Sequence, residues 1–223
     1  MSIWVKICAN TSLDDALLAV DAGADAVGFI FAPSPRRVTA AQVAAIAPRL
    51  PANVEKIGVF VDAALDEIVS TVQLCGLTGV QLHFDADSEL PGRLRERLGS
   101  EARILRVIHF NAEATPQQQV QIVAHARNPY IDAVLVDSLT ATAVGGTGMV
   151  FDWAAARKAL FQYSETRKHL IAAGGLNPAN VATAIAALRP WGVDVASGVE
   201  ASPGHKDPTR VREFVTRAKA GNT

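Results

Sequence analysis

Cys8 and Asp137 are the residues whose types and positions best suit acid–base chemistry. Cys8 ends a largely apolar stretch that starts at Ile3, and Asp137 ends one that starts at Ala133. A thiolate favoured by a nearby cation is a base, and a buried carboxyl group that keeps its proton is an acid. The simpler alternatives are a core cysteine, and an aspartate that caps a turn or pairs with a buried cation such as Lys6.

Two short segments rich in small residues could bind a phosphate group. One contains Gly174 and Gly175, the other contains Ser197 and Gly198, and each follows an apolar run. Without bulky side chains, backbone N–H groups can approach an anion closely, and the N-terminus of a following helix adds a favourable dipole. The glycines could instead only permit tight turns, but two such segments at adjacent strand ends favour phosphate.

The other candidate binding residues are two arginines and a histidine. Arg36 and Arg37 follow the second apolar run, and His83 ends the fourth. An exposed arginine pair is usually ordinary surface charge. At the mouth of a barrel, one of the two could hold a substrate carboxylate through a bidentate contact.

Short apolar runs alternate along the chain with longer helix-like segments. The runs are rich in Val, Ile and Leu, as parallel strands covered on both faces should be. Eight of each predict an α/β fold, a single (β/α)8 TIM barrel, and an open doubly wound sheet is the alternative. The predicted strands are Ile3–Cys8, Ala26–Phe31, Lys56–Val61, Val80–His83, Ile104–Ile108, Ala133–Asp137, Leu170–Ala173 and Val193–Ser197. The predicted helices are Leu13–Val20, Ala40–Leu50, Leu65–Leu74, Leu90–Leu98, Pro116–Arg127, Trp153–Phe161, Pro178–Leu188 and Pro208–Lys219.

The two-residue period of a strand sorts the side chains into two sets. The valines are expected to face the outer helices, and a polar set is expected to point into the barrel: Lys6, Cys8, Gln81, His83, Asp137 and Asp194. Polar groups inside a barrel are costly unless they are paired or used. Those at the C-terminal strand ends are the candidates for use. Asp194 lies deeper in its strand and is expected to be a structural partner of Lys6.

Length and composition limit the classes of protein. The chain has 223 residues, 49% of them hydrophobic, and no composition break, so residues 1–223 are predicted to form one domain. A net charge of −1 gives no reason to expect nucleic acid or a membrane as a partner. Only Cys8 and Cys75 are cysteines, which is typical of a cytoplasmic protein, and a monomer is the default expectation.

Two stretches could suggest a membrane or a secretory route, and the sequence argues against both. The first residues are too few and too soon polar for a signal peptide. The uncharged stretch from Leu170 to Leu188 contains Gly174, Gly175 and Pro178. It is therefore predicted to be a strand, a turn and a helix, not one spanning helix.

Taken together, the motifs resemble the phosphoribosylanthranilate isomerase family along nearly the whole chain. Each motif is short, and their order and number make the resemblance specific. They are Val5-Lys6-Ile7-Cys8, Gly23-Ala24-Asp25-Ala26-Val27-Gly28-Phe29, Ser34-Pro35-Arg36-Arg37, Gly58-Val59-Phe60-Val61, Val80-Gln81-Leu82-His83, Asp137-Ser138, Gly145-Gly146-Thr147-Gly148, Phe151-Asp152-Trp153, Gly174-Gly175-Leu176-Asn177-Pro178, Val193-Asp194-Val195, Ser197-Gly198-Val199-Glu200 and Gly204-His205-Lys206-Asp207.

The resemblance implies an Amadori rearrangement without metal or cofactor. N-(5-phosphoribosyl)anthranilate would become 1-(2-carboxyphenylamino)-1-deoxyribulose 5-phosphate, a step of tryptophan biosynthesis. The matching positions imply Asp137 as general acid and Cys8 as general base. They also imply Arg37 as the residue that binds the anthranilate carboxylate. The glycine segments would hold the phosphate of this small-molecule substrate, and His83 would contribute to binding.

Two residues depart from the family pattern. Ala9 stands where the family usually has glycine after the cysteine, and Phe84 stands where it usually has glycine after the histidine. If the first position has a positive φ, alanine would strain the backbone or tilt Cys8. These departures keep two alternatives open: a catalytically silent barrel that binds a phosphorylated ligand, and a related sugar-phosphate isomerase such as one of histidine biosynthesis.

Overall fold

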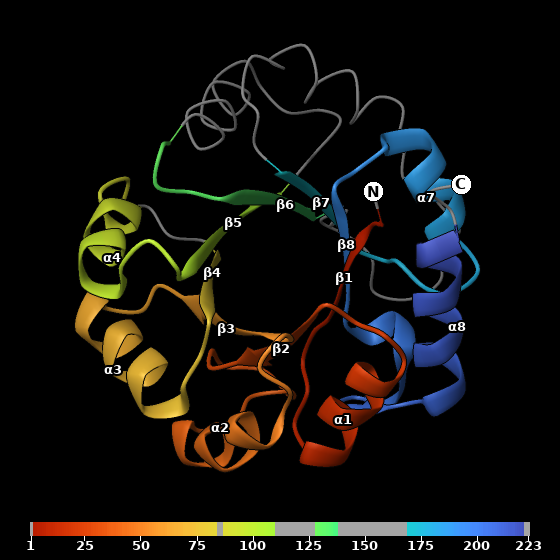
Figure 1. Ribbon diagram of the computed structural model, residues 1–223, viewed down its shortest axis with the longest axis horizontal. Helices are drawn as coiled ribbons and strands as arrows, with labels where there is room; N and C mark the ends of the chain where they lie inside the picture. The colour runs from red at the N-terminus through yellow and green to blue at the C-terminus, as the bar shows by residue number, and fades with distance from the viewer. Residues whose placement is uncertain (1, 84–86, 110–127, 138–168, 221–223) are drawn as a thin grey trace.

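The computed structural model describes residues 2–83, 87–109, 128–137 and 169–220. Within them, eight parallel strands form a closed barrel in chain order, and the helices surround it (Figure 1). The ring closes where β1 pairs with β8, with Lys6 opposite Asp194. The predicted barrel is confirmed, and the open sheet is wrong. The strands are β1 Trp4–Ile7, β2 Ala26–Ile30, β3 Glu55–Val61, β4 Gly79–His83, β5 Arg103–His109, β6 Ala133–Asp137, β7 His169–Ala173 and β8 Gly192–Val195.

Six of the predicted helices are confirmed within the described residues. They are α1 Leu13–Asp21, α2 Ala40–Ile46, α3 Leu65–Cys75, α4 Leu90–Leu98, α7 Val181–Leu188 and α8 Pro208–Ala220; the 3-10 helix η1 Ala47–Arg49 extends α2. Side-chain caps explain two of the starts. The Ser12 hydroxyl accepts a hydrogen bond from the backbone N–H of Asp15, and Thr39 forms a capping box with Gln42. The predicted helices Pro116–Arg127 and Trp153–Phe161 lie outside the described residues.

The stretch from Leu170 to Leu188 is a strand, a turn and a helix, as predicted, but its helix begins at Val181 and not at Pro178. Asn177 holds the preceding turn. Its side-chain oxygen accepts from the backbone N–H of Ala179, and its own N–H donates to the side chain of Asn180. Among the described residues, no helix combines the length and apolar character needed to cross a membrane.

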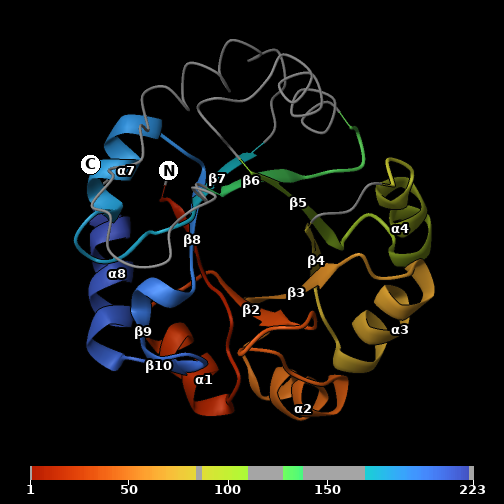
Figure 2. The same ribbon diagram turned by 180° about the vertical axis from the view of Figure 1, so that it is seen from behind.

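Three short elements after β8 were not predicted. The chain forms the 3-10 helix η2 Ser197–Val199 and then a two-stranded antiparallel hairpin, β9 Glu200–Ser202 and β10 His205–Lys206. Ser197 therefore lies in η2, and the prediction that the eighth strand extends to it was wrong. Figure 2 shows β9 and β10 beside α1. The backbone N–H of Lys206 donates to Asp15 of α1 at 3.2 Å, which fixes the hairpin there.

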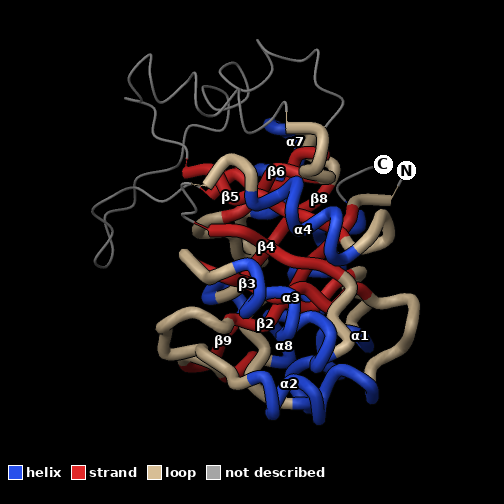
Figure 3. Tube along the Cα trace, turned by 90° about the vertical axis from the view of Figure 1, so that its left-hand side faces the viewer, coloured by secondary structure: helices blue, strands red, loops and turns tan. Residues whose placement is uncertain are grey.

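Strand alternation separates two apolar clusters, and most strand valines lie in the outer one, as predicted. Val5, Ile7, Val80 and Leu82 pack with the outer helices. From the side, α3 and α4 lie in front of β3 and β4 (Figure 3). The inner cluster fills the barrel and consists of Trp4, Ala26, Ile57, Leu105, Val107, Ala133, Leu135, Ile171 and Ala173. The barrel is thus a packed core that leaves its carboxyl end for polar residues.

Candidate active site

Cys8 directly follows β1 and is buried, with 5% of its surface exposed. Its backbone N–H donates to the carbonyl of Val195 at 2.8 Å, which ties it to the last barrel strand. Gly28 of β2 makes room for its side chain. A Cβ atom at Gly28 would lie 2.7 Å from Cys8 Sγ and 3.0 Å from Lys6 Cε. The missing side chain therefore lets the thiol and the lysine stem pack against the same strand.

Lys6 is fully buried beneath the thiol. Its ammonium donates to Asp194 Oδ1 at 2.8 Å and to Gln81 Oε1 at 3.0 Å. This confirms that Asp194 is a structural partner of Lys6 and that Lys6, Gln81 and Asp194 point inward. Burial lowers the pKa of Lys6, but the interactions with Asp194 and Cys8 together raise it above its ordinary value, so Lys6 keeps its positive charge.

The surroundings of Cys8 act on its pKa in opposite directions. Burial raises the pKa of the thiol, Lys6 lowers it, Asp194 raises it and Lys206 lowers it. The balance lies above the ordinary value of 9.0. The group is therefore a strong base once deprotonated, and the two cations limit the cost of its thiolate form.

A second buried network lies above Cys8 and was not predicted from the sequence. The ammonium of Lys206 in β10 donates to the carbonyl oxygen of Cys8 at 2.6 Å and lies 3.3 Å from Glu200 Oε1. The guanidinium of Arg36 donates to the same carboxylate from Nε at 2.9 Å and from Nη2 at 2.7 Å. The motifs that contain Glu200 and Lys206 were visible in the sequence. Their function was not, because the hairpin that turns both side chains toward Cys8 has only five residues in its strands.

The two arginines after β2 have different surroundings. Arg36 is half-buried and bound to Glu200, whereas Arg37 is exposed. Within the described part of the chain, no hydrogen bond or ion pair is found for the Arg37 guanidinium, although its backbone N–H donates to the carbonyl of Ser34 at 3.0 Å. Arg36 therefore forms its ion pair within the protein, and the guanidinium of Arg37 remains available to bind an anion.

His83 and Asp137 end β4 and β6, and both are half-buried. By strand alternation each shares the inner face, His83 with Gln81 and Asp137 with Leu135. Because all barrel strands are parallel, both side chains lie at the same end of the barrel as Cys8. The structure therefore places these three predicted residues on the carboxyl end, where barrel enzymes carry out their chemistry.

The loops after β7 and β8 are in direct contact. A Cβ atom on Gly198 would lie 1.8 Å from the carbonyl oxygen of Leu176, so only glycine fits there. Gly174 and Gly175 have φ values of 79° and 61°, which favour glycine. Gly175 and Ser197 are exposed, and Gly198 is partly so. The predicted adjacency of the two loops is confirmed, and part of their glycine content is explained by packing and backbone conformation.

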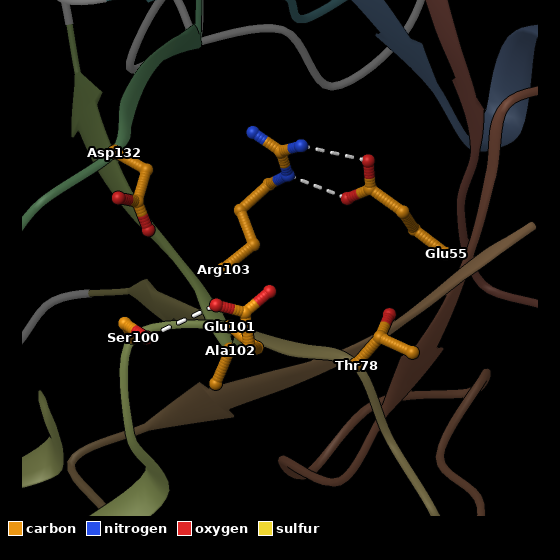
Figure 4. A pocket seen from close by; sticks show the side chains of 7 residues that line it. All are labelled: Glu55, Thr78, Ser100, Glu101, Ala102, Arg103 and Asp132. Carbon is orange, nitrogen blue, oxygen red and sulfur yellow. Dashed lines mark hydrogen bonds and ion pairs between the residues drawn. The ribbon is translucent and has the colours of Figure 1, made fainter.

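Another pocket lies at the amino end of the barrel, opposite the end that carries Cys8 (Figure 4). Its lining residues are Glu55, Thr78, Ser100, Glu101, Ala102, Arg103 and Asp132. Arg103 is paired with Glu55, with Nη2 2.9 Å from Oε1, and Asp132 accepts from Arg95 at 2.8 Å. Glu55, Arg103 and Asp132 are thus engaged in ion pairs, which join β3, β5 and the segment before β6 and give the pocket a structural role.

The comparisons with known proteins agree with this geometry. Over residues 5–217 the chain matches the family model described as N-(5'phosphoribosyl)anthranilate (PRA) isomerase. It is 40% identical over 218 residues to the N-(5'-phosphoribosyl)anthranilate isomerase of Pelobacter propionicus, a match that covers 97% of this chain and 96% of that protein. The chain belongs to the N-(5'-phosphoribosyl)anthranilate isomerase family. The family resemblance inferred from the motifs is confirmed.

Solved isomerases of this family share the barrel. The phosphoribosyl anthranilate isomerase of Thermotoga maritima superposes with a TM-score of 0.84 at 35% identity, covering 98% of this chain and 99% of that one. A structure of the isomerase in complex with reduced 1-(o-carboxyphenylamino)-1-deoxyribulose 5-phosphate superposes with a TM-score of 0.81 at 33% identity, with the same coverage.

Of the two departures from the isomerase motifs, one is described. Ala9 is buried and has a φ of 62°, in the left-handed region that favours glycine. Ala9 therefore has the positive φ at which the sequence predicts backbone strain after Cys8. Phe84 lies outside the described residues.

Proposed function

We propose that the chain catalyses the Amadori rearrangement of N-(5'-phosphoribosyl)anthranilate in tryptophan biosynthesis, with Asp137 as general acid and Cys8 as general base. The observation that supports the pair most is their placement at the carboxyl ends of β6 and β1. The strands β7 and β8 lie between them in the ring. Two groups that reach the centre from different strands can act on opposite sides of one sugar carbon.

The proposed reaction needs one proton donor and one proton acceptor. Asp137 protonates the furanose ring oxygen, the bond between that oxygen and C1′ breaks, and an iminium forms between C1′ and the anthranilate nitrogen. Cys8 then removes the proton from C2′, and its electron pair forms the C1′–C2′ double bond of an enolamine. Tautomerisation gives the 2′-ketone, 1-(2-carboxyphenylamino)-1-deoxyribulose 5-phosphate. No metal or cofactor takes part.

The substrate's charges match the binding residues. We assign the anthranilate carboxylate to Arg37, whose guanidinium is exposed at the barrel mouth. The phosphate lies against the loops after β7 and β8, with Gly174, Gly175, Ser197 and Gly198 as the binding residues, and His83 contacts the substrate from β4. The support for this arrangement is the contact between the two loops and the product analogue bound by the solved isomerase.

The test is turnover of freshly prepared substrate, followed by loss of its fluorescence. Wild type should be active, and Cys8→Ser and Asp137→Asn should each lower kcat by at least about 100-fold, the usual contribution of a general acid or base. Cys75→Ser is the matched control, because Cys75 is buried at the end of α3 and donates to the carbonyl of Ala40. Near-normal turnover in either site variant would contradict the acid–base assignment.

A folded wild type without turnover would contradict the isomerase proposal itself. Binding of the reduced product by that inactive protein would support the silent phosphate-ligand barrel, for which the strained Ala9 is the relevant observation. We further propose that residues 1–223 form one catalytic domain that acts in the cytoplasm as a monomer, without nucleic acid or a membrane as partner. Sedimentation of the purified chain tests its oligomeric state.

A further inference from the structure

Lys6 is the feature of the site that the proposed reaction does not use. Its ammonium is enclosed in the barrel with two acceptors, Asp194 from the neighbouring strand β8 and Gln81 from β4, farther round the ring. An apolar residue of similar length could fill the same space without the desolvation of two charges, and such replacements are often neutral or stabilising. A buried ion pair under the candidate base therefore points to a contribution beyond stability.

The position of Lys6 relative to Cys8 indicates that contribution. Their side chains pack on the same side of Gly28, where a single Cβ atom would touch both Sγ and the lysine Cε. The ammonium has three N–H donors, and Asp194 and Gln81 accept hydrogen bonds from two of them, so these acceptors fix its orientation. The charge of Lys6 lowers the pKa of the Cys8 thiol against the effect of burial, and so favours the thiolate.

We propose that Lys6 is a positioning residue that holds the Cys8 side chain and stabilises its thiolate, while Asp194 and Gln81 orient the lysine. This inference rests on the proposed role of Cys8 as the base. It adds no step to the reaction, because the Lys6 proton stays on nitrogen throughout. Its effect is to raise the fraction of enzyme in which Cys8 can accept the proton from C2′.

Other charged groups, both acidic and basic, also lie near Cys8. Asp194 raises the pKa of the Cys8 thiol and Lys206 lowers it, and the charge of Arg36 also interacts favourably with the thiolate. Lys206 binds the Cys8 carbonyl and is neutralised by Glu200. His83 and Asp137 share the barrel end from β4 and β6. Of these cations, Lys6 is the one whose side chain packs beside the sulfur at Gly28, and the test therefore centres on it.

The experiment titrates the Cys8 thiolate by its ultraviolet absorbance, in a Cys75→Ala background that leaves one thiol. We expect Lys6→Met to lower the thiolate fraction at a fixed pH about tenfold, a shift of one pKa unit. Alkylation by iodoacetamide should slow by a similar factor, and the acid limb of kcat/KM should move to higher pH with little change in KM. Lys6→Arg, which restores the charge, should recover most of the loss.

Two further variants keep the test decisive. Lys56→Met removes a buried lysine that donates to the carbonyl of Pro51 and should leave the titration unchanged. If Lys6→Met does not fold, Lys6→Met combined with Asp194→Asn removes both charges together, and its thiolate should still titrate above wild type. An unchanged titration in a folded variant without Lys6 would overturn the inference. A shifted titration in a chain whose turnover does not need Cys8 would instead overturn the proposed function and leave the electrostatic pairing standing.

Discussion

Arg36 and Glu200 form a bidentate ion pair that joins the loop after β2 to the hairpin after β8. Nε lies 2.9 Å from Oε1 and Nη2 lies 2.7 Å from Oε2. The same carboxylate lies 3.3 Å from Lys206, whose ammonium holds the carbonyl of Cys8. One buried glutamate thus connects the loop that carries Arg37 to the turn that carries the candidate base.

Glu200→Gln should destabilise the protein strongly, because it leaves the buried Lys206 without a counter-charge. We expect the free energy of unfolding to fall by about 3 kcal/mol, measured by urea denaturation. The control is Glu213→Gln, which breaks a half-exposed ion pair with Arg217 on α8 and should cost less than about 1 kcal/mol. Equal losses in the two variants would contradict the view that Glu200 is the central residue of the network.

The contribution of Glu200 should depend on pH in the acid range. Burial alone raises the pKa of Glu200, but hydrogen bonds from Arg36 and the charge of Lys206 bring it below its ordinary 4.5. A carboxyl group with a depressed folded pKa stabilises the protein fully above its unfolded pKa and loses that effect as the pH falls through the folded value. The stability gap between wild type and Glu200→Gln should therefore be full at neutral pH and narrow below pH 4.5. A gap that stays constant across this range would contradict the assignment.

Arg37 and its neighbour Arg36 should give opposite phenotypes. Arg37→Ala should lower kcat/KM roughly 10- to 100-fold through KM, because a charge-assisted bidentate contact to the substrate is lost. Its unfolding free energy should change by less than about 0.5 kcal/mol, as for other exposed positions. Arg36→Ala should instead destabilise the fold. Steady-state kinetics and urea titrations of both variants test this prediction. A raised KM in Arg36→Ala but not in Arg37→Ala would show that Arg36, not Arg37, binds the carboxylate.

Ala9→Gly should stabilise the protein. At a φ of 62° a Cβ atom costs roughly 1–2 kcal/mol, which exceeds the 0.4–1 kcal/mol or so that glycine adds to the entropy of the unfolded chain. A rise in the free energy of unfolding of up to about 1 kcal/mol is expected. Ala45→Gly, at an exposed position in α2, should lose about 1 kcal/mol instead. A loss in both variants would show that the backbone at Ala9 is not strained.

Gly198→Ala should disturb both phosphate loops. Its Cβ atom would overlap the carbonyl oxygen of Leu176, so one loop must move, at a cost of roughly 1–3 kcal/mol. Binding of inorganic phosphate, measured by calorimetry, should weaken with it. At Gly175 an added Cβ meets nothing within 4 Å, and the cost there comes from its φ of 61° alone. Unweakened phosphate binding in Gly198→Ala would argue that these loops do not form the phosphate site.

The fold and the inner polar residues were predictable because strand alternation is a local signal. The period of two that placed the valines outward also placed Lys6, Gln81 and Asp194 inward, and the structure has all three there. The positions of Cys8, His83 and Asp137 followed from the same rule. Strand boundaries were less certain at the ends, where Ser197 belongs to a 3-10 helix.

The pairing of Arg36 with Glu200 could not be predicted, since 164 residues separate the two in the chain. No periodicity marks a contact between a loop and a hairpin whose two strands have only five residues. The different contacts of Arg36 and Arg37 could not be predicted either, because the two arginines are neighbours in the sequence. Only the packing of β9 against the loop after β2 distinguishes them. The left-handed backbone at Ala9 was inferable only through the family's glycine.

The closure of the ring has a consequence for synthesis of the protein. The Lys6–Asp194 ion pair and the bond from Lys206 to the Cys8 carbonyl join residues 188 and 198 positions apart. A ribosome releases the amino end long before these partners. Until the last strand and the hairpin emerge, the nascent chain therefore lacks both of these contacts around Cys8. The rate at which a thiol reagent modifies Cys8 should therefore change when these contacts form, and it reports the time at which the two ends of the polypeptide pack together.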